Sequence, residues 1–130
     1  MGSLTHPTVR RVVDRARRDP AILAVILFGS HARGEASAES DVDLCLVLAS
    51  ATTPKLTMSR TRLAYLAEDK LDLVIFQQLP LHVRSRVLKE GKVLLVRDEE
   101  ALYDVAIRAA RAFEHFRHIQ RAYLDEIARG

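Results

Sequence analysis

The chain has 130 residues, of which 48% are hydrophobic and 28% charged, and its formal net charge is +3. This length suits one domain with its own core, and the composition is that of a globular protein, not a disordered or fibrous one. No apolar stretch approaches the roughly 20 residues that span a bilayer, and no secretory signal precedes the first element. We therefore expect a cytoplasmic protein, and the modest charge gives no indication of nucleic-acid binding.

Hydrophobic periodicity predicts helices and strands that alternate along the chain. In chain order we expect a helix over 8–18, strands over 24–28 and 44–48, a helix over 54–68, a strand over 71–76, a helix over 80–89, a strand over 92–96 and a helix over 99–128. The alternation predicts an α/β fold, with one sheet covered by helices, in a single domain over 1–130.

Some of these elements carry more detailed expectations. The helix that starts at Pro54 should be capped by Thr53, and its inward positions are expected at Leu56, Leu63, Leu66 and Ala67. The strand over 92–96 is short and starts with a lysine, which favours a sheet edge. Cys45 is the only cysteine, so no internal disulfide can form. Amid leucines on a strand it is expected to be a core residue.

Two carboxylates lie at the start of an apolar run that is expected to form a core strand. Carboxylates at this position do not contribute to a hydrophobic core. Asp41 and Asp43 are two residues apart, and on a strand such side chains point to the same face with Cα atoms roughly 6–7 Å apart. Their mutual repulsion costs stability unless a cation lies between them. Oxygen ligands of this kind favour magnesium.

Gly29-Ser30 ends the preceding apolar run and supplies a complementary feature. A glycine at the end of a strand permits a tight turn that a Cβ would obstruct. A helix that begins between Ser30 and Arg33 would present free N–H groups to an anion. Phosphate contacts on one side and divalent cations on the other predict a site for a nucleoside triphosphate.

The pattern of Gly29-Ser30, ten residues, then Asp41-x-Asp43 resembles the signature of the polymerase-β-like nucleotidyltransferase superfamily. The segment GSHARGEA…SDVDL resembles the corresponding sequence of the minimal nucleotidyltransferases (MNT), the antitoxins of prokaryotic HEPN–MNT toxin–antitoxin pairs. The family pattern includes a third carboxylate on a later strand, and Asp72 lies in the apolar run 71–76. The resemblance implies a small mixed sheet, two Mg²⁺ ions and ATP as donor.

The resemblance also implies roles for individual residues. Asp41, Asp43 and Asp72 would bind the metals, and Asp72 would help to deprotonate the attacking hydroxyl. Ser30 and Gly29 would bind the terminal phosphates. We expect Arg33 to contact phosphate as well, although pairing with a nearby glutamate on the surface is an alternative. The implied acceptor is a tyrosine of a cognate HEPN toxin, which AMP transfer silences.

The last predicted helix, over 99–128, is long for a domain of this size. Its apolar positions recur every three or four residues: Leu102, Ala106, Ala109, Phe113, Phe116, Tyr123 and Ile127. At the usual rise it would be near 40 Å long, more than the roughly 30 Å span of such a domain. We expect the part from Phe113 onward to project and to contact a partner, either the toxin or a second copy. The alternative is that the helix folds back over the sheet.

Three alternative functions are open at this point. The spacing of Arg111 and His118 fits the loose motif of HEPN ribonucleases, but one long helix does not make the helical bundle that such enzymes need. The chain could neutralise a toxin by binding alone. It could also modify a small molecule, although the aminoglycoside-modifying relatives carry a further helical domain that we do not expect here.

Overall fold

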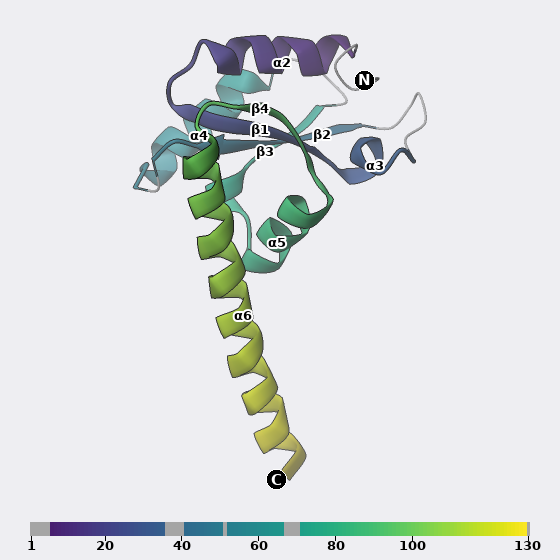
Figure 1. The fold of residues 1–130 in the computed structure, drawn as a ribbon, viewed down its shortest axis with the longest axis vertical. Helices are drawn as coiled ribbons and strands as arrows, with labels where there is room; N and C mark the ends of the chain where they lie inside the picture. Colours follow the sequence, from purple (N-terminus) through teal and green to yellow (C-terminus); the bar gives the residue numbers. More distant parts are fainter. Residues whose placement is uncertain (1–5, 36–40, 51, 67–70, 130) are drawn as a thin grey trace.

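The structure is a computed structural model that describes residues 6–35, 41–50, 52–66 and 71–129 (Figure 1). Its four strands are β1 (Ile22–Phe28), β2 (Val42–Leu48), β3 (Leu71–Ile75) and β4 (Lys92–Val96). They form one sheet in the order β3-β2-β1-β4. β1 is antiparallel to β2 and β4, whereas β2 is parallel to β3. The mixed sheet and the edge position of β4 are therefore confirmed.

The helices follow the predicted order with small shifts at their ends. They are α2 (Pro7–Arg17), α3 (Gly29–Ala32), α4 (Lys55–Tyr65), the 3₁₀ helix η1 (Phe76–Gln78), α5 (Leu81–Glu90) and α6 (Glu99–Arg129). α5 ends at Glu90, and Gly91 is its C-cap. The backbone of Gly91 is not left-handed. An added Cβ there would collide with the Ile26 side chain and the Val87 carbonyl oxygen.

Helices cover both faces of the sheet. α2 and α4 pack on one face, where Val12, Val13 and Tyr65 join the apolar side chains of β1 and β2. α5 and the first turns of α6 pack on the other face around Val87 and Ala109. Because both faces are buried, the central strands read as continuous apolar runs and not as alternating ones. Cys45 is fully buried on β2, as expected.

The expectation for α4 was wrong in two respects. Leu56 and Leu63 are both more than 60% exposed, and Met58 and Tyr65 are the buried residues of this helix. The N-cap is Pro54, while the Thr53 hydroxyl donates to the Ser50 carbonyl oxygen at 2.9 Å. Two positions were therefore assigned to the wrong face of the helix. Leu66 does pack against the core, and the expectation for Ala67 lies outside the described residues.

α6 is the element that gives the molecule its elongated shape. Its 31 residues make it about 46 Å long at the usual helical rise. Only its first turns pack on the sheet, through Leu102, Val105 and Ala109, and the remainder extends away from the body (Figure 1). The projection expected from Phe113 onward is therefore confirmed. Within the described residues, none of the helices combines the length with the hydrophobicity that crossing a bilayer requires.

Candidate active site

Asp43 and Asp72 are two carboxylates that the structure brings side by side. β2 and β3 run parallel, and Asp43 is the register partner of Asp72. On its other side Asp43 pairs with Phe28, the last residue of β1. Asp43 thus lies near the start of the central strand β2, between the last residue of β1 and the start of β3. The pairing supports the assignment of Asp72 as the third acid of the site.

Gly29 forms the wall of this site beside Asp43. Its φ is +73°, a left-handed conformation that strongly favours glycine. A Cβ at this position would lie 2.9 Å from the Asp43 carboxyl carbon, and closer still to one of its oxygens. The turn after β1 therefore approaches the carboxylate without a side chain in between. The expected need for glycine here has two causes, the backbone conformation and the contact with Asp43.

The pKa of Asp43 reflects burial first and the neighbouring acids second. Burial raises the pKa of its carboxyl from an ordinary 3.8 to about 6, with further contributions from the charge of Asp72, a hydrogen bond with Asp72 and the charge of Asp41. The charge of His31 acts in the opposite direction and lowers this pKa. Three carboxylates thus influence one another at a half-buried position, where negative charge is in excess.

Asp41 has a different environment from the one that its spacing suggests. It precedes β2, which begins at Val42, and it is exposed. The pleat of a strand therefore does not hold it beside Asp43. Its charge nevertheless contributes to the raised pKa of Asp43. Asp41 is close enough to act on the same site, although it lies outside the strand that holds Asp43.

In the described part of the connection between β1 and β2, residues 29–35 and 41, the helix is the single turn α3. It begins at Gly29, one residue before the predicted start, and is too short to sum a helix dipole. The Ser30 carbonyl oxygen accepts a hydrogen bond from the Glu35 N–H at 2.9 Å, which closes the turn. Phosphate binding at Ser30 therefore depends on local N–H groups and the hydroxyl, and it stays a prediction.

Arg33 is engaged with acids in this structure. Its Nε donates to Glu35 Oε2 at 3.1 Å, and its Nη1 lies 3.7 Å from Glu90 Oε2 at the end of α5. This matches the surface-pairing alternative, with Glu90 as a partner that the sequence did not indicate. Both pairs are largely solvated and weak, so Arg33 could exchange them for a phosphate. Its phosphate contact also stays a prediction.

One histidine near the site was missed. His6 caps the N-terminus of α2, and its ring lies edge-on to that of His31, with centroids 5.9 Å apart. Within the described residues, the buried Nδ1 of His6 has no hydrogen-bond partner. No sequence signal links the two positions, because they are 25 residues apart and only the tertiary structure brings their rings together.

The donor set is chemically suited to a magnesium ion. Asp43 and Asp72 offer only oxygen ligands, and the excess negative charge at Asp43 is what a divalent cation would neutralise. The described residues contain no preassembled group of three or more His, Cys, Asp or Glu side chains that could hold a metal. The fit therefore depends on the Asp43–Asp72 pair, with Asp41 close by.

Solved structures share this fold. A chain from a crystal structure of a toxin–antitoxin complex with AMP-PNP superposes with a TM-score of 0.66 at 21% identity, covering 90% of this chain and 96% of that one. A chain from the complex of tri-AMPylated Shewanella oneidensis HEPN toxin with MNT antitoxin gives a TM-score of 0.66 at 17% identity, covering 98% of each. At these identities the likeness concerns the fold.

Two further similarities are found at the level of sequence, one to a curated relative and one to a family profile. The relative is "Putative protein adenylyltransferase MJ1547" of Methanocaldococcus jannaschii, 30% identical over 73 residues. The match covers 56% of this chain and 55% of that protein, so the chain spans about half the length of the relative. The profile described as "Polymerase beta, Nucleotidyltransferase" matches residues 11–100, which include β1, α3, β2, β3 and the candidate acids. The chain therefore belongs to the polymerase beta nucleotidyltransferase family.

Proposed function

We propose that this chain is a magnesium-dependent nucleotidyltransferase antitoxin that transfers AMP from ATP to a tyrosine hydroxyl of a cognate HEPN toxin. The observation that carries the proposal is the register pair of Asp43 and Asp72 beside Gly29. Similar structures include an AMPylated HEPN toxin with its MNT antitoxin and a complex with AMP-PNP. The proposal places the chain in the cytoplasm, where ATP and such a toxin would be met.

The reaction assigns a task to each residue. The acceptor hydroxyl oxygen forms a bond to the α-phosphorus, the bond from that phosphorus to the bridging oxygen breaks, and pyrophosphate leaves. Asp72, exposed at the edge of the sheet, takes part in removing the hydroxyl proton. Ser30 and the open backbone at Gly29 bind the terminal phosphates, and Arg33 joins them once it leaves Glu35 and Glu90.

Asp41, Asp43 and Asp72 would hold two Mg²⁺ ions. When bound, these ions supply positive charge to the phosphate oxygens and to the departing pyrophosphate. The raised pKa of Asp43 is consistent with this role, because a cation would stabilise a carboxylate that is partly buried and lies beside other acids.

The test is intact-mass spectrometry of a HEPN-domain protein encoded beside this chain, incubated with the chain, ATP and Mg²⁺. We expect the partner to gain one or more AMP units. Asp43→Asn and Asp72→Asn should each reduce the rate at least ~100-fold. Asp14→Asn is the matched control, because Asp14 is an exposed aspartate on α2. A partner that binds stably and never gains AMP would refute the proposed reaction.

Neutralisation by binding alone is the second candidate. It is favoured by the long exposed part of α6, which contacts no other described element. Toxin inhibition that persists in Asp43→Asn would support it, because contact alone does not need a metal ligand.

A further inference from the structure

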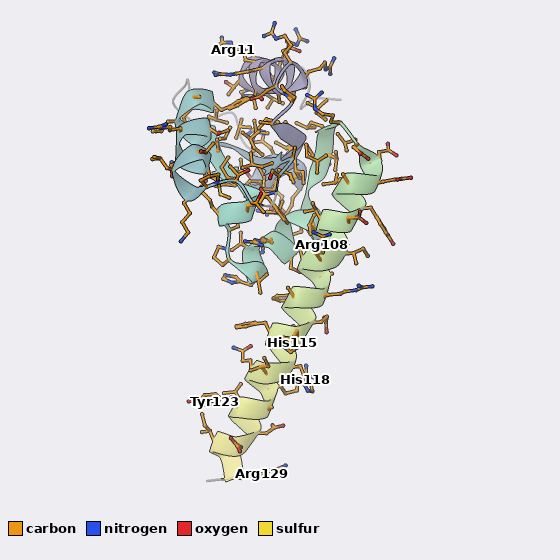
Figure 2. The ribbon with its side chains drawn as sticks, turned by 90° about the vertical axis from the view of Figure 1, so that its left-hand side faces the viewer. Arg11, Arg108, His115, His118, Tyr123 and Arg129 are labelled. Atoms are coloured by element: carbon orange, nitrogen blue, oxygen red, sulfur yellow. The ribbon has the colours of Figure 1, made fainter. Side chains whose placement is uncertain are left out.

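The exposed side of α2 and its C-cap carries almost only arginines. From residue 10 to residue 18, every exposed residue is charged: Arg10, Arg11, Asp14, Arg15, Arg17 and Arg18. Five arginines and one aspartate give residues 7–18 a formal charge of +4, whereas the whole chain carries +3. The remainder of the chain is therefore slightly negative, and the modest net charge conceals a strongly basic helix. Figure 2 shows Arg11 of this helix at the end of the molecule opposite Arg129, the tip of α6.

Four of these arginines form two rows along the helix. Arg10 and Arg17 are seven residues apart, which is close to two helical turns, and so are Arg11 and Arg18. The two members of each row are therefore about 10 Å apart along the helix axis. Because consecutive residues turn by about 100°, the two rows lie side by side with Asp14 between them. We call Arg10, Arg11, Arg17 and Arg18 the arginine face.

The charges of the arginine face are largely uncompensated. Among the described residues, no acid is close enough to form an ion pair with Arg10, Arg17 or Arg18. Arg15 differs, because its guanidinium donates to the Ala64 carbonyl oxygen and so joins α2 to α4. The arginine face thus presents positive charge to solvent, and Arg15 has a structural contact within the protein.

The distribution of apolar side chains indicates which kind of partner suits this face. Where the structure describes the chain, the large hydrophobic side chains that are exposed lie on α4, β4 and α6, and none lies on α2. The apolar side of α2 packs on its own sheet. A protein interface has an apolar centre, and a helix that lies on a bilayer turns its apolar side to the lipid. Phosphate groups need neither, because guanidinium groups bind them through paired N–H donors.

We infer that the arginine face of α2 binds the phosphate backbone of a nucleic-acid duplex without sequence preference. A duplex presents regularly spaced phosphates, and contacts to them carry no sequence information. A duplex suits the face better than a single strand, because proteins that bind single strands stack the bases on aromatic side chains, and α2 has no aromatic residue besides its N-cap, His6. RNA and DNA duplexes share this phosphate chemistry. The inference goes beyond the proposed function, because no residue of the face is assigned to AMP transfer.

The test measures binding of the full chain to labelled RNA and DNA duplexes of about 20 base pairs by fluorescence anisotropy. With four phosphate contacts, the affinity should fall roughly 100-fold between about 50 and about 200 mM salt. The comparison ligands are a single strand of the same length, polyglutamate and vesicles that contain phosphatidylserine. At the lower salt concentration, at least one duplex should bind at least ~3-fold more tightly than each of these, because a duplex has the highest density of phosphates.

Two double variants locate the surface. Arg10→Gln/Arg17→Gln removes one row, so it should weaken duplex binding at least ~10-fold at the lower salt concentration and reduce the salt slope by about 1.8. Arg111→Gln/Arg121→Gln is the matched control, since it removes the same charge from two exposed arginines of α6. It should weaken binding at most ~3-fold and leave the slope unchanged. Circular dichroism checks that both variants keep their helix content.

Asp14→Asn should change binding in the opposite direction. Removal of the single acid between the two rows should tighten duplex binding at least ~2-fold. A variant that merely disturbed α2 would not bind more tightly. Asp43→Asn should bind the duplexes as the parent chain does, which separates failure of this inference from failure of the proposed reaction.

Several results would overturn the inference. Equal weakening by the two double variants would mean that overall charge, and not α2, attracts the duplex. Tighter binding of polyglutamate would make an acidic protein the partner, and tighter binding of the vesicles would make it a membrane surface. A single strand that binds more tightly than both duplexes would exclude recognition of the duplex backbone. Absence of duplex binding at the lower salt concentration would leave the arginine face without this ligand.

Discussion

Asp43 on β2 is directly paired in register with Asp72 on the parallel strand β3, so two acids from segments 29 residues apart share one edge of the sheet. Burial and the neighbouring acids raise the pKa of Asp43 to about 6. A sheet optimised for stability alone would not place two carboxylates opposite each other. Without a cation this arrangement costs folding free energy. The site can therefore be tested by measuring the stability of the purified protein.

Gly29→Ala should destabilise the protein and abolish transfer. The added methyl group meets a positive φ and the Asp43 carboxyl at the same time. We expect a loss of about 1 kcal/mol from the backbone and a further 1–3 kcal/mol, roughly, from the contact. Urea denaturation measures both losses together.

Gly34→Ala separates the two contributions. Gly34 has φ +72°, nearly the same as Gly29, but an added Cβ there meets no atom within 4 Å. We expect it to show the backbone loss alone and to keep activity. Equal losses for the two variants would mean that the contact with Asp43 has no energetic weight.

The metal-free protein should lose stability as the pH rises from about 4 to about 6. Because the folded state holds the Asp43 proton more tightly than the unfolded chain does, this stability is fully present below the ordinary pKa of 3.8 and is gone above about 6. Since the group is only half-buried, solvent screening limits the effect to about 1 kcal/mol. Denaturation in EDTA at several pH values measures it.

Asp43→Asn is the control for this pH dependence. Its amide does not titrate, so its stability should change less between pH 4 and 6 than that of the parent chain. At pH 7 the metal-free variant should be the more stable of the two. If the two proteins lose stability in parallel over this range, another group is responsible.

Mg²⁺ should stabilise the parent chain at pH 7.5. At a concentration ten times the dissociation constant, the gain is about 1.4 kcal/mol, which differential scanning fluorimetry would record as a rise in melting temperature. Asp43→Asn should lose most of this rise, and Asp14→Asn should keep it. A rise of the same size in all three proteins would indicate a general ion effect and no site at Asp43.

Cys45 should be unreactive in the folded protein. It is fully buried on β2, and burial raises the pKa of its thiol from 9.0 to about 12. At pH 8 its thiolate fraction is therefore on the order of 10⁻⁴. A thiol reagent should label it only after unfolding, with a rate that follows urea concentration. Rapid labelling without urea would show that β2 opens locally.

The order of the elements could be predicted from the sequence alone, and the sequence alone also proposed the candidate acids. Residues such as Gly29, Asp41 and Pro80 mark the ends of elements through their local conformational preferences. These preferences depend on the neighbouring sequence and not on tertiary contacts. The same is true of the apolar positions of α6, whose three- and four-residue spacing already indicated a helix too long for its domain. These are short-range properties, so no knowledge of the fold was needed to find them.

Only the tertiary structure decided which groups meet. The pairing of Asp43 with Asp72, the contact of Gly29 with Asp43 and the ion pair of Arg33 with Glu90 all join distant segments. The inward face of α4 was misjudged for the same reason, because a leucine at helical spacing is buried only if the sheet lies on that side. Sequence pattern specifies which residues are suited to a face or a site, whereas register and helix packing determine which neighbours they have.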